Sequence, residues 1–564
     1  MKLSFIPKGI PAYALFVLSI LFFSCDKKSD SLGKIGDLDG MLTVKVLGSS
    51  EYSAAEIAKL ASTKPVISTE DEDEVVTEIV EHPAFDVQTS FSKNSLNKSN
   101  LPLLGQVGLP NFAKGSLFAA KMEQNVKYRL VLYTEDDQLF EDQILKAGED
   151  AKIVVNNGAT YKWYAYSHNT EDDPVAFGSD GTIDIPEGVD FLYASGTIDI
   201  PEESEENHTL DITFAHKLAR VQVEVNTMGM FADIEDATIS IDGWSPQTAK
   251  INLFNGNLSD QTDYALEFEF SDFTVIEPPY KDRVQFTIYT AGSPSGNLDL
   301  KITDLKLKID DESIRDFEPL LSSTPMTFSF SNMNLEPGKS YTALANLIES
   351  PLELEGVRWA RQNLYYKGGH NPYRFYHTYA HHENDQRQFF SFRAEQPNIY
   401  AGRDSEGDPC ALVYPEGTWK TPKNSDFNNS INKRERQGLD LNARKYPQTN
   451  GTLDGKGYAE YPQTNGTAAP YPGDNLRFNM NGYGFEIGVI ENLITLNFGQ
   501  QGSQGYYWSH DKILEIPLVA GLGSNYFSVR NSGNSMSTII LGLDLIGIDI
   551  LRFNFHNVRC IRAN

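Results

Sequence analysis

The sequence predicts a mainly β fold. Between residues 41 and 350, short segments alternate apolar and polar side chains, as Leu42, Val44 and Val46 do, and a period of two is typical of half-buried strands. Turn pairs such as Asn157-Gly158 separate these segments. Many short strands joined by tight turns favour β-sandwiches over α/β folds.

The predicted strands follow one another in chain order. They are Met41–Leu47, Tyr128–Tyr133, Tyr161–Tyr166, Ile212–Phe214, Val221–Val225, Ala237–Ile241, Val284–Tyr289, Leu298–Ile309 and Met326–Phe330. Turns are predicted at Asn157-Gly158, Asp242-Gly243, Asn255-Gly256 and Pro337-Gly338. Residues 51–100 interrupt the pattern with the acidic run Glu70–Glu74 in a Ser/Thr/Asn-rich stretch, so we expect a mobile insertion or an irregular loop there.

The chain of 564 residues is long enough for two to four domains at about 150 residues each. Only four arginines precede residue 350 and fourteen follow it, and the aromatic content rises at the same point. We therefore expect a β region over residues 41–350, with an internal break near 205–245, and a C-terminal domain over 351–564. Residues 1–25 form a separate leader, and the Gly-, Ser- and Asp-rich residues 26–40 are predicted to be a flexible tether.

The charge balance excludes two classes of partner. The net charge is −29 and the pI is about 4.7. Nucleic-acid phosphates require stripes of Lys and Arg, and anionic lipid surfaces attract basic segments. An acidic surface instead fits a solvated extracellular protein.

The leader has the organisation of a secretory signal. Lys2 and Lys8 precede the apolar run Tyr13–Ser24, which is shorter than the roughly 20 residues of a membrane-spanning helix. Cys25 closes the run and charged residues follow it. The segment resembles a bacterial lipoprotein precursor in which Cys25 would be lipidated, and two or three acyl chains hold a protein firmly on a membrane. Phe22 stands where such precursors usually carry Leu. The alternative is an ordinary cleaved signal with an incidental Cys.

The sequence also predicts a glycosylation site and a disulfide. Asp30-Ser31-Leu32 resembles a short acceptor pattern for O-glycosylation at Ser31. With Cys25 lipidated, Cys410 and Cys560 remain, and an exported protein can pair them. Two separate buried thiols are the alternative; we favour the disulfide.

The β region resembles the fimbrillin family, the subunits of type V pili. The segments that carry the resemblance are Tyr128–Tyr133, Tyr161–Tyr166, Phe191–Ala194, Ile212–Val225 and Leu335–Tyr341. The resemblance implies a transthyretin-like β-sandwich fold. Within the longest segment, no carboxylate–His motif spacing or second His surrounds His216, so we expect it to pack between strands and to bond a backbone carbonyl.

The C-terminal domain resembles a loop-rich α+β module of the C-type-lectin-like fold, related to the Fibrobacter major paralogous domain. The segments that carry this resemblance are Val357–Leu364, Cys410 with Pro415–Pro422, Gly505–Ser509 and Val558–Arg562. In that family the Cys usually adjoins the Pro, whereas here four residues intervene. The matched first and last Cys support a Cys410–Cys560 bridge, and we expect the Trp residues to be core residues rather than sugar platforms.

The sequence indicates no catalytic, metal or cofactor site. His377 and His381 have helical spacing with Glu383 nearby, but the flanking Asn371-Pro372 and Asn384-Asp385 predict a loop, so we expect no zinc site. Glu395-Gln396-Pro397-Asn398 only partly matches the calcium and sugar motif of true C-type lectins. The chain contains no Gly-x-Ser-x-Gly elbow, Walker loop or His-Glu-x-x-His motif. We therefore expect a protein that is not an enzyme.

The fimbrillin resemblance implies assembly by strand exchange. In that family an Arg-specific protease removes the N-terminal strand, and a neighbour's strand fills the groove by β-augmentation. Met41–Leu47, with Met41, Leu42, Val44 and Val46, is the candidate exchange strand. No Arg precedes Arg129, however, so trimming by such a protease ahead of the first strand is excluded. We expect this subunit to keep its strand and its lipid, unless a Lys such as Lys45 or Lys64 is cut.

These observations predict a surface-exposed, lipid-anchored protein of the outer membrane or fimbrium. Its role is that of a pilus-associated anchor or tip subunit, or of a stand-alone adhesin, with other pilus subunits or surface ligands as partners. A stalk role is disfavoured because a stalk subunit needs a free C-terminal end. The alternative is a glycan-binding or glycan-processing surface lipoprotein.

Overall fold

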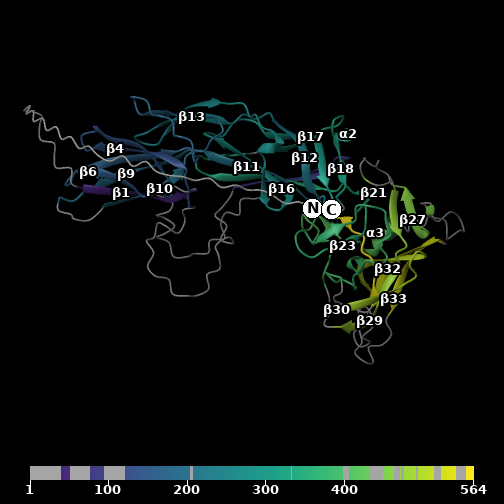
Figure 1. Cartoon of the computed structure of the whole chain (residues 1–564). Coiled ribbons are helices and arrows are strands. Elements are labelled where there is room, and N and C mark those ends of the chain that lie inside the picture. The colour runs from purple at the N-terminus through teal and green to yellow at the C-terminus, as the bar shows by residue number, and fades with distance from the viewer. Residues whose placement is uncertain are drawn as a thin grey trace, which may run out of the picture.

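The computed structural model shows a mainly β protein, as predicted. It describes residues 40–50, 76–93, 121–202, 208–310, 312–331, 333–397, 406–431, 449–462, 471, 475–490, 493–513, 523–531, 533–540 and 554–563. Two sandwiches lie end to end, and the C-terminal region sits beside the second of them (Figure 1). No helix within the described ranges has the length and apolar character needed to span a membrane.

The first sandwich is a seven-stranded sheet that packs against itself. Its strand order is β5-β4-β7-β9-β10-β1-β6. The strands are β1 (Gly40–Ser50), β4 (Lys127–Thr134), β5 (Leu139–Lys146), β6 (Ala151–Val155), β7 (Thr160–Ser167), β9 (Leu192–Asp199) and β10 (His208–His216). β9 and β10 pair through two residue pairs, and the buried side chains of both halves form one cluster. The sheet therefore turns a corner at the β9–β10 ladder.

A three-stranded sheet covers part of the outer face of this sandwich. It contains β8 (Thr182–Asp184), β13 (Gln247–Asn252) and β14 (Leu258–Asp263), in the order β14-β13-β8. Ile183 and Ile251 of this sheet pack with Val131, Tyr166 and Tyr193 of the large sheet. The first sandwich is therefore covered in part by β13 and β14, which follow β11 and β12 of the second sandwich in the chain.

The second sandwich has a six-stranded and a four-stranded sheet. The first has the order β15-β16-β11-β20-β3-β2 and the second contains β12, β17, β18 and β19. Their bounds are β2 (Val76–Val80), β3 (Asp86–Lys93), β11 (Ala219–Gly229), β12 (Asp233–Asp242), β15 (Thr274–Glu277), β16 (Tyr280–Thr290), β17 (Leu298–Lys308), β18 (Ile314–Asp316), β19 (Met326–Phe330) and β20 (Ser340–Ile348), with the short helices η2 (Phe270–Asp272) and α2 (Glu318–Leu321). Met326, Phe328 and Phe330 show why the sequence folds this way, since alternate residues of β19 face the core.

The expectation of an insertion or irregular loop throughout residues 51–100 was wrong for the part of that segment that the structure describes. β2 and β3 form a hairpin, and β3 pairs antiparallel with β20 from Asp86↔Ile348 to Lys93↔Tyr341. Phe85 and Val87 are fully buried in the core of the second sandwich. In chain order, β2 and β3 of the second sandwich therefore come after β1 but before the other strands of the first sandwich.

The C-terminal region is made of several small sheets. Its elements are β21 (Leu352–Leu354), β22 (Val357–Trp359), β23 (Leu364–Tyr366), β24 (Tyr373–Phe375), η3 (Gln386–Gln388), β25 (Trp419–Lys420), α3 (Asn424–Asn429), β26 (Thr449–Leu453), β27 (Lys456–Pro462), β28 (Asn475–Asn479), β29 (Tyr483–Ile490), β30 (Leu493–Gly499), β31 (Gln504–Ile513), β32 (Gly523–Arg530), β33 (Gly533–Ile540), β34 (Asn554–Phe555) and β35 (Ile561–Arg562). The two ends of the region meet in one ladder, where Trp359 pairs with Ile561. Within the described residues, the helical part of the predicted α+β module is limited to α3 and η3.

The predicted turn at Pro337-Gly338 has a steric reason to carry glycine. Gly338 has a φ of 76°, a region that L side chains rarely adopt. A Cβ at this position would lie 2.8 Å from the carbonyl oxygen of His216. This close approach places the start of β20 beside the segment that joins the two sandwiches.

Candidate functional site: the N-terminal strand and its neighbours

Strand β1 lies inside the large sheet of the first sandwich. On one side it pairs parallel with β10, from Leu42↔His208 to Ser50↔Ala215. On the other side it pairs antiparallel with β6, from Gly40↔Val155 to Val44↔Ala151. The predicted strand is therefore confirmed. Its first half has neighbours on both edges, whereas the residues after Val44 pair with β10 alone.

The side chains of β1 alternate between the core and the surface. Leu42 and Val44 are fully buried, and Val46 is half-buried against the same cluster. Met41 and Leu47 point away from the core and are 36% and 40% exposed. Burying a side chain such as Leu or Val contributes roughly 1.5–3 kcal/mol. Removal of β1 would therefore open an apolar groove between β6 and β10, with unpaired backbone groups along both.

Two basic residues considered as trimming sites, Lys45 and Arg129, lie within paired strands. Lys45 belongs to the β1–β10 ladder opposite Asp211, and its Nζ lies 3.8 Å from Asp150. Arg129 lies in β4 between β5 and β7, and its guanidinium donates to both carboxylate oxygens of Asp142 at 2.6 and 2.7 Å. A protease needs an extended, unpaired backbone, so neither site can be cut while its strand stays in the sheet. Lys64 lies outside the described residues.

His216 has a different partner from the one expected. Its Nδ1 lies 2.8 Å from Oδ2 of Asp190, and both side chains are largely buried. Asp190 also accepts from the backbone N–H of Phe191 at 2.8 Å. The expectation of a backbone carbonyl partner was therefore wrong, although His216 does pack between strands. The pair fixes the corner between β9 and β10, and its sequence separation of 26 residues gave no local signal.

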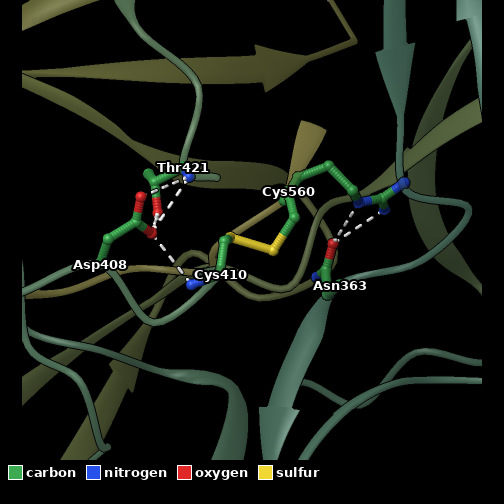
Figure 2. Close-up of a disulfide and its surroundings, with 6 residues drawn as sticks. Asn363, Asp408, Cys410, Thr421 and Cys560 are labelled. Carbon is green, nitrogen blue, oxygen red and sulfur yellow. Dashed lines mark hydrogen bonds between the residues drawn. A yellow bond between two sulfur atoms is a disulfide. The ribbon is translucent and has the colours of Figure 1, made fainter. Parts of the chain in front are cut away.

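The disulfide between Cys410 and Cys560 is confirmed. The two residues are 150 positions apart and both are fully buried (Figure 2). Beside it, Asp408 accepts from the backbone N–H of Cys410 at 3.0 Å and from the Thr421 hydroxyl at 2.6 Å. The bridge therefore fastens the last strand to the middle of the C-terminal region.

The tryptophans of the C-terminal region are core residues. Trp359, Trp419 and Trp508 are each at most 2% exposed. The Trp508 indole N–H donates to the carbonyl of Phe390 at 2.7 Å, and Trp419 packs edge-on against Phe375. The expectation of core packing is confirmed, and these three rings cannot serve as sugar platforms.

The histidines between residues 370 and 382 do not converge on one point. His370 bonds Asp282 of the second sandwich, whereas His382 stacks on Tyr376 at 3.8 Å. Burial lowers the pKa of His381 and His382 below the usual value. The part of the chain that the structure describes contains no group of three or more His, Cys, Asp or Glu side chains arranged to hold a metal ion. Cys25 and Ser31 lie outside the described residues.

Sequence reasoning missed a buried group of charged residues between the second sandwich and the C-terminal region. We call it the ion-pair junction; its members are Asp86, Arg315, Glu349, Arg361 and Arg562. Arg562 of β35 donates to Asp86 of β3 at 2.5 Å, and Arg315 of β18 lies 3.4 Å from Glu349 at the end of β20. Each residue of these two pairs is about 95% buried or more. The partners are distant in sequence, so no spacing or motif predicts them.

The ring of Tyr471 packs against two arginines of the ion-pair junction. The guanidinium of Arg361 lies 3.8 Å from the centre of its ring and that of Arg315 lies 4.9 Å from it. Burial raises the pKa of Glu349 and of Asp86 above their ordinary values, while the neighbouring arginines act in the opposite direction. Cation–π contacts and ion pairs together offset the cost of burying this many charges.

The central part of the chain is similar to a known protein family. Residues 112–357 match a family model described as fimbrillin-like. The matched residues cover most of both sandwiches, so the predicted resemblance is confirmed over these residues. The resemblance of the C-terminal region to a lectin-like module stays a prediction. No curated protein matches the chain.

Several solved structures are similar to parts of the chain. A candidate cell adhesion protein from Bacteroides fragilis is 16% identical, with a TM-score of 0.30 over 40% of this chain and 81% of its own. The fimbrial anchor protein Mfa2 from Porphyromonas gingivalis is 15% identical, with a TM-score of 0.20 over 32% of this chain and 69% of its own. A candidate cell adhesion protein from Bacteroides eggerthii is 13% identical, with a TM-score of 0.24 over 55% of this chain and 86% of its own.

Proposed function

We propose that this chain is a cell-surface lipoprotein of the fimbrillin type, held in the outer membrane through acylated Cys25. It acts as a pilus-associated anchor or tip subunit, or as a stand-alone adhesin, and not as an enzyme. Its partners are other pilus subunits or surface ligands. The match of residues 112–357 to the fimbrillin-like family supports the adhesive or fimbrial role.

The position of β1 is the observation that carries this proposal. β1 is paired on both edges in its first half and fills the core with Leu42 and Val44. The first Arg of the chain, Arg129, lies in an interior strand of the same sheet. A subunit without an Arg ahead of β1 keeps both the strand and the lipid, and so remains a membrane anchor for whatever it carries.

The burial of β35, the last described strand, argues against a stalk role. β35 lies inside the sheet of order β21-β22-β35-β25, and Arg562 within it is buried against Asp86. A stalk subunit must offer a C-terminal segment to its neighbour, as an added strand does in β-augmentation. Releasing β35 would leave Asp86 buried without its partner.

Mass spectrometry of the mature protein, purified from its own membrane, tests the proposal. We expect an acylated Cys25 on a chain that is continuous through residue 128. A Cys25→Ser variant is the control and should be lost from the membrane fraction. A mature chain that begins after Lys45 or later would contradict the proposal, as would a ladder of heat-resistant polymers on denaturing gels.

A further inference from the structure

A polar cleft lies where the second sandwich meets the C-terminal region. Its volume is about 380 Å³, within the range of about 300–1,000 Å³ that small-molecule sites occupy. The second sandwich supplies Tyr280, Asp282 and Asp310, and the β23–β24 hairpin with its turn supplies Lys367, His370 and Arg374. We call it the junction cleft. Neither part of the molecule forms it alone.

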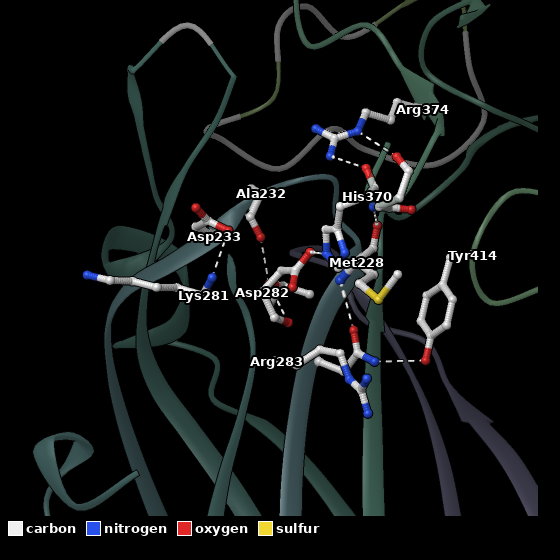
Figure 3. Close-up of polar contacts among 12 residues, drawn as sticks. Met228, Ala232, Asp233, Lys281, Asp282, Arg283, His370, Arg374 and Tyr414 are labelled. Atoms are coloured by element: carbon white, nitrogen blue, oxygen red, sulfur yellow. Dashed lines mark hydrogen bonds and ion pairs between the residues drawn. The ribbon is translucent and has the colours of Figure 1, made fainter. Parts of the chain in front are cut away.

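One wall of the junction cleft is an aromatic pair above a buried carboxylate. Tyr280 and His370 stack with their ring centres 3.9 Å apart, and Tyr280 is 39% exposed. His370 Nε2 lies 2.7 Å from Oδ2 of Asp282, as Figure 3 shows. Asp282 is only 4% exposed, and its Oδ1 has no hydrogen-bond partner. Because this oxygen is shielded from solvent, Asp282 holds His370 in place beside Tyr280 and does not itself contact a ligand in the cleft.

A second group of lining residues is organised around Asp310. Its carboxylate accepts from Arg374 at 2.7 Å and from the Tyr365 hydroxyl at 2.9 Å, and it lies 3.2 Å from Lys367 Nζ. Arg374 also donates to the carbonyl of Asn371 at 2.7 Å, which orients its guanidinium (Figure 3). Fixed donors and acceptors of this kind define the orientation of a ligand without reorganisation.

Most of the charged side chains that line the junction cleft have a partner within it, although four acidic residues, Asp233 among them, stand against three Lys and Arg residues. Asp282 faces His370, Asp310 faces both Arg374 and Lys367, and Lys308 lies 2.5 Å from Glu312. A free ion would have to compete with these internal partners. A neutral molecule would not, because its hydroxyls can both donate to the partly exposed carboxylate of Asp310 and accept from the guanidinium and ammonium groups.

The turn between β23 and β24 leaves room in the junction cleft. A Cβ on Gly368 would meet only one heavy atom, at 4.0 Å, and a Cβ on Gly369 would meet none within 4 Å. Both glycines line the cleft. A larger side chain at Gly368 would therefore occupy space that a ligand could use, without a clash that forces the backbone to move.

We propose that the junction cleft binds the end of a neutral carbohydrate chain. The apolar face of a sugar ring packs on aromatic surface, which Tyr280 offers, and sugar hydroxyls match a lining of alternating donors and acceptors. The proposal rests on the adhesin part of the proposed function, because it names the class of surface ligand that such an adhesin would hold.

The test uses the full chain on an array of defined oligosaccharides. The array carries neutral glycans that end in hexose or N-acetylhexosamine, together with sialylated and sulfated counterparts. We expect retention on neutral glycans. Tyr280→Ala removes the aromatic surface and Gly368→Leu fills the space, so each should weaken binding by about tenfold or more. Phe254→Ala is the matched control, since Phe254 is a 45% exposed aromatic residue that packs against Tyr133 and Tyr164 of the first sandwich and does not line the cleft.

Three results would overturn the junction cleft as a carbohydrate site. They are no binding to neutral glycans, binding to the acidic glycans only, and full binding by both Tyr280→Ala and Gly368→Leu. Adhesion of cells with and without the chain, measured in parallel with its accessibility to antibody on intact cells, separates the two proposals. A chain that is exposed on the surface and promotes adhesion but binds no glycan on the array would refute only the carbohydrate site. A chain that is absent from the surface would refute the proposed function.

Discussion

Arg562 of the last described strand donates a 2.5 Å hydrogen bond to Asp86, 476 residues earlier in the chain. Both side chains are at most 3% exposed. The guanidinium also lies 4.2 Å from the ring centre of Trp419. This pair joins β3 of the second sandwich to β35 of the C-terminal region through a buried electrostatic contact.

Arg562→Leu should strongly destabilise the protein. It leaves the Asp86 carboxylate buried without its partner, and breaking a buried pair in this way costs about 3–5 kcal/mol. The double variant Asp86→Asn with Arg562→Leu should recover part of the loss. Lys93→Ala is the control, because its ion pair with Glu336 is partly exposed and worth less than about 1 kcal/mol. Urea unfolding measures all four proteins; equal losses for Arg562→Leu and Lys93→Ala would contradict the role of the pair.

Removal of the disulfide should destabilise the C-terminal region. The bridge closes a loop of 150 residues between Cys410 and Cys560, for which the chain-entropy model gives about 5 kcal/mol. The variant with both cysteines changed to Ala should therefore unfold at clearly lower urea concentration. Cys25→Ser, which removes the one other cysteine, should unfold as the unmodified protein does. A loss of less than about 1 kcal/mol would show that the bridge has little effect on the unfolded chain.

Local patterns in the sequence predicted most of the sandwich strands and their turns. Gly158, Gly243, Gly256 and Gly338 all have positive φ, as the predicted turn pairs require. In β19 the alternation of apolar and polar residues matches the alternation of buried and exposed residues. These features depend on neighbours within a few positions, which is why a single sequence reveals them.

The features that the sequence did not reveal depend on distant partners. β3 is rich in Ser, Thr and Gln, and it becomes a strand because β20 pairs with it from about 250 positions away. Asp86 and Arg562 look like ordinary surface charges in the sequence, and only their shared burial makes them a pair. The junction cleft likewise arises from packing between two parts of the chain, so none of its residues forms a motif.

Leu42→Ala should destabilise the first sandwich and loosen β1. The fully buried side chain leaves a cavity, and such substitutions cost about 2–5 kcal/mol. Met41→Ala is the matched control in the same strand, and its exposed side chain should contribute within about 0.5 kcal/mol. A Lys-specific protease provides a second measurement, because cleavage after Lys45 requires β1 to leave its ladder. Faster cleavage in Leu42→Ala than in Met41→Ala is expected, and equal rates would contradict the proposed role of core packing in retaining the strand.

Acidification should destabilise the C-terminal region through His556. Complete burial lowers the pKa of this imidazole from 6.5 to about 3, and its ring stacks on Trp508 at 4.0 Å. Between these two pH values the unfolded chain binds a proton that the folded chain does not, so stability falls as the pH falls, by about 1.4 kcal/mol per unit.

His556→Phe provides the measurement of this pH dependence, because Phe keeps an aromatic ring against Trp508 and removes the titration. Asp86 and Glu349 act in the opposite direction: burial raises the pKa of both carboxyls, so the folded chain takes up their protons first as the pH falls. The difference between the two proteins therefore isolates the histidine. Urea unfolding from pH 6.5 down to about 4 should show a shallower loss of stability in His556→Phe. Parallel curves for the two proteins would show that His556 does not stay neutral in the folded chain.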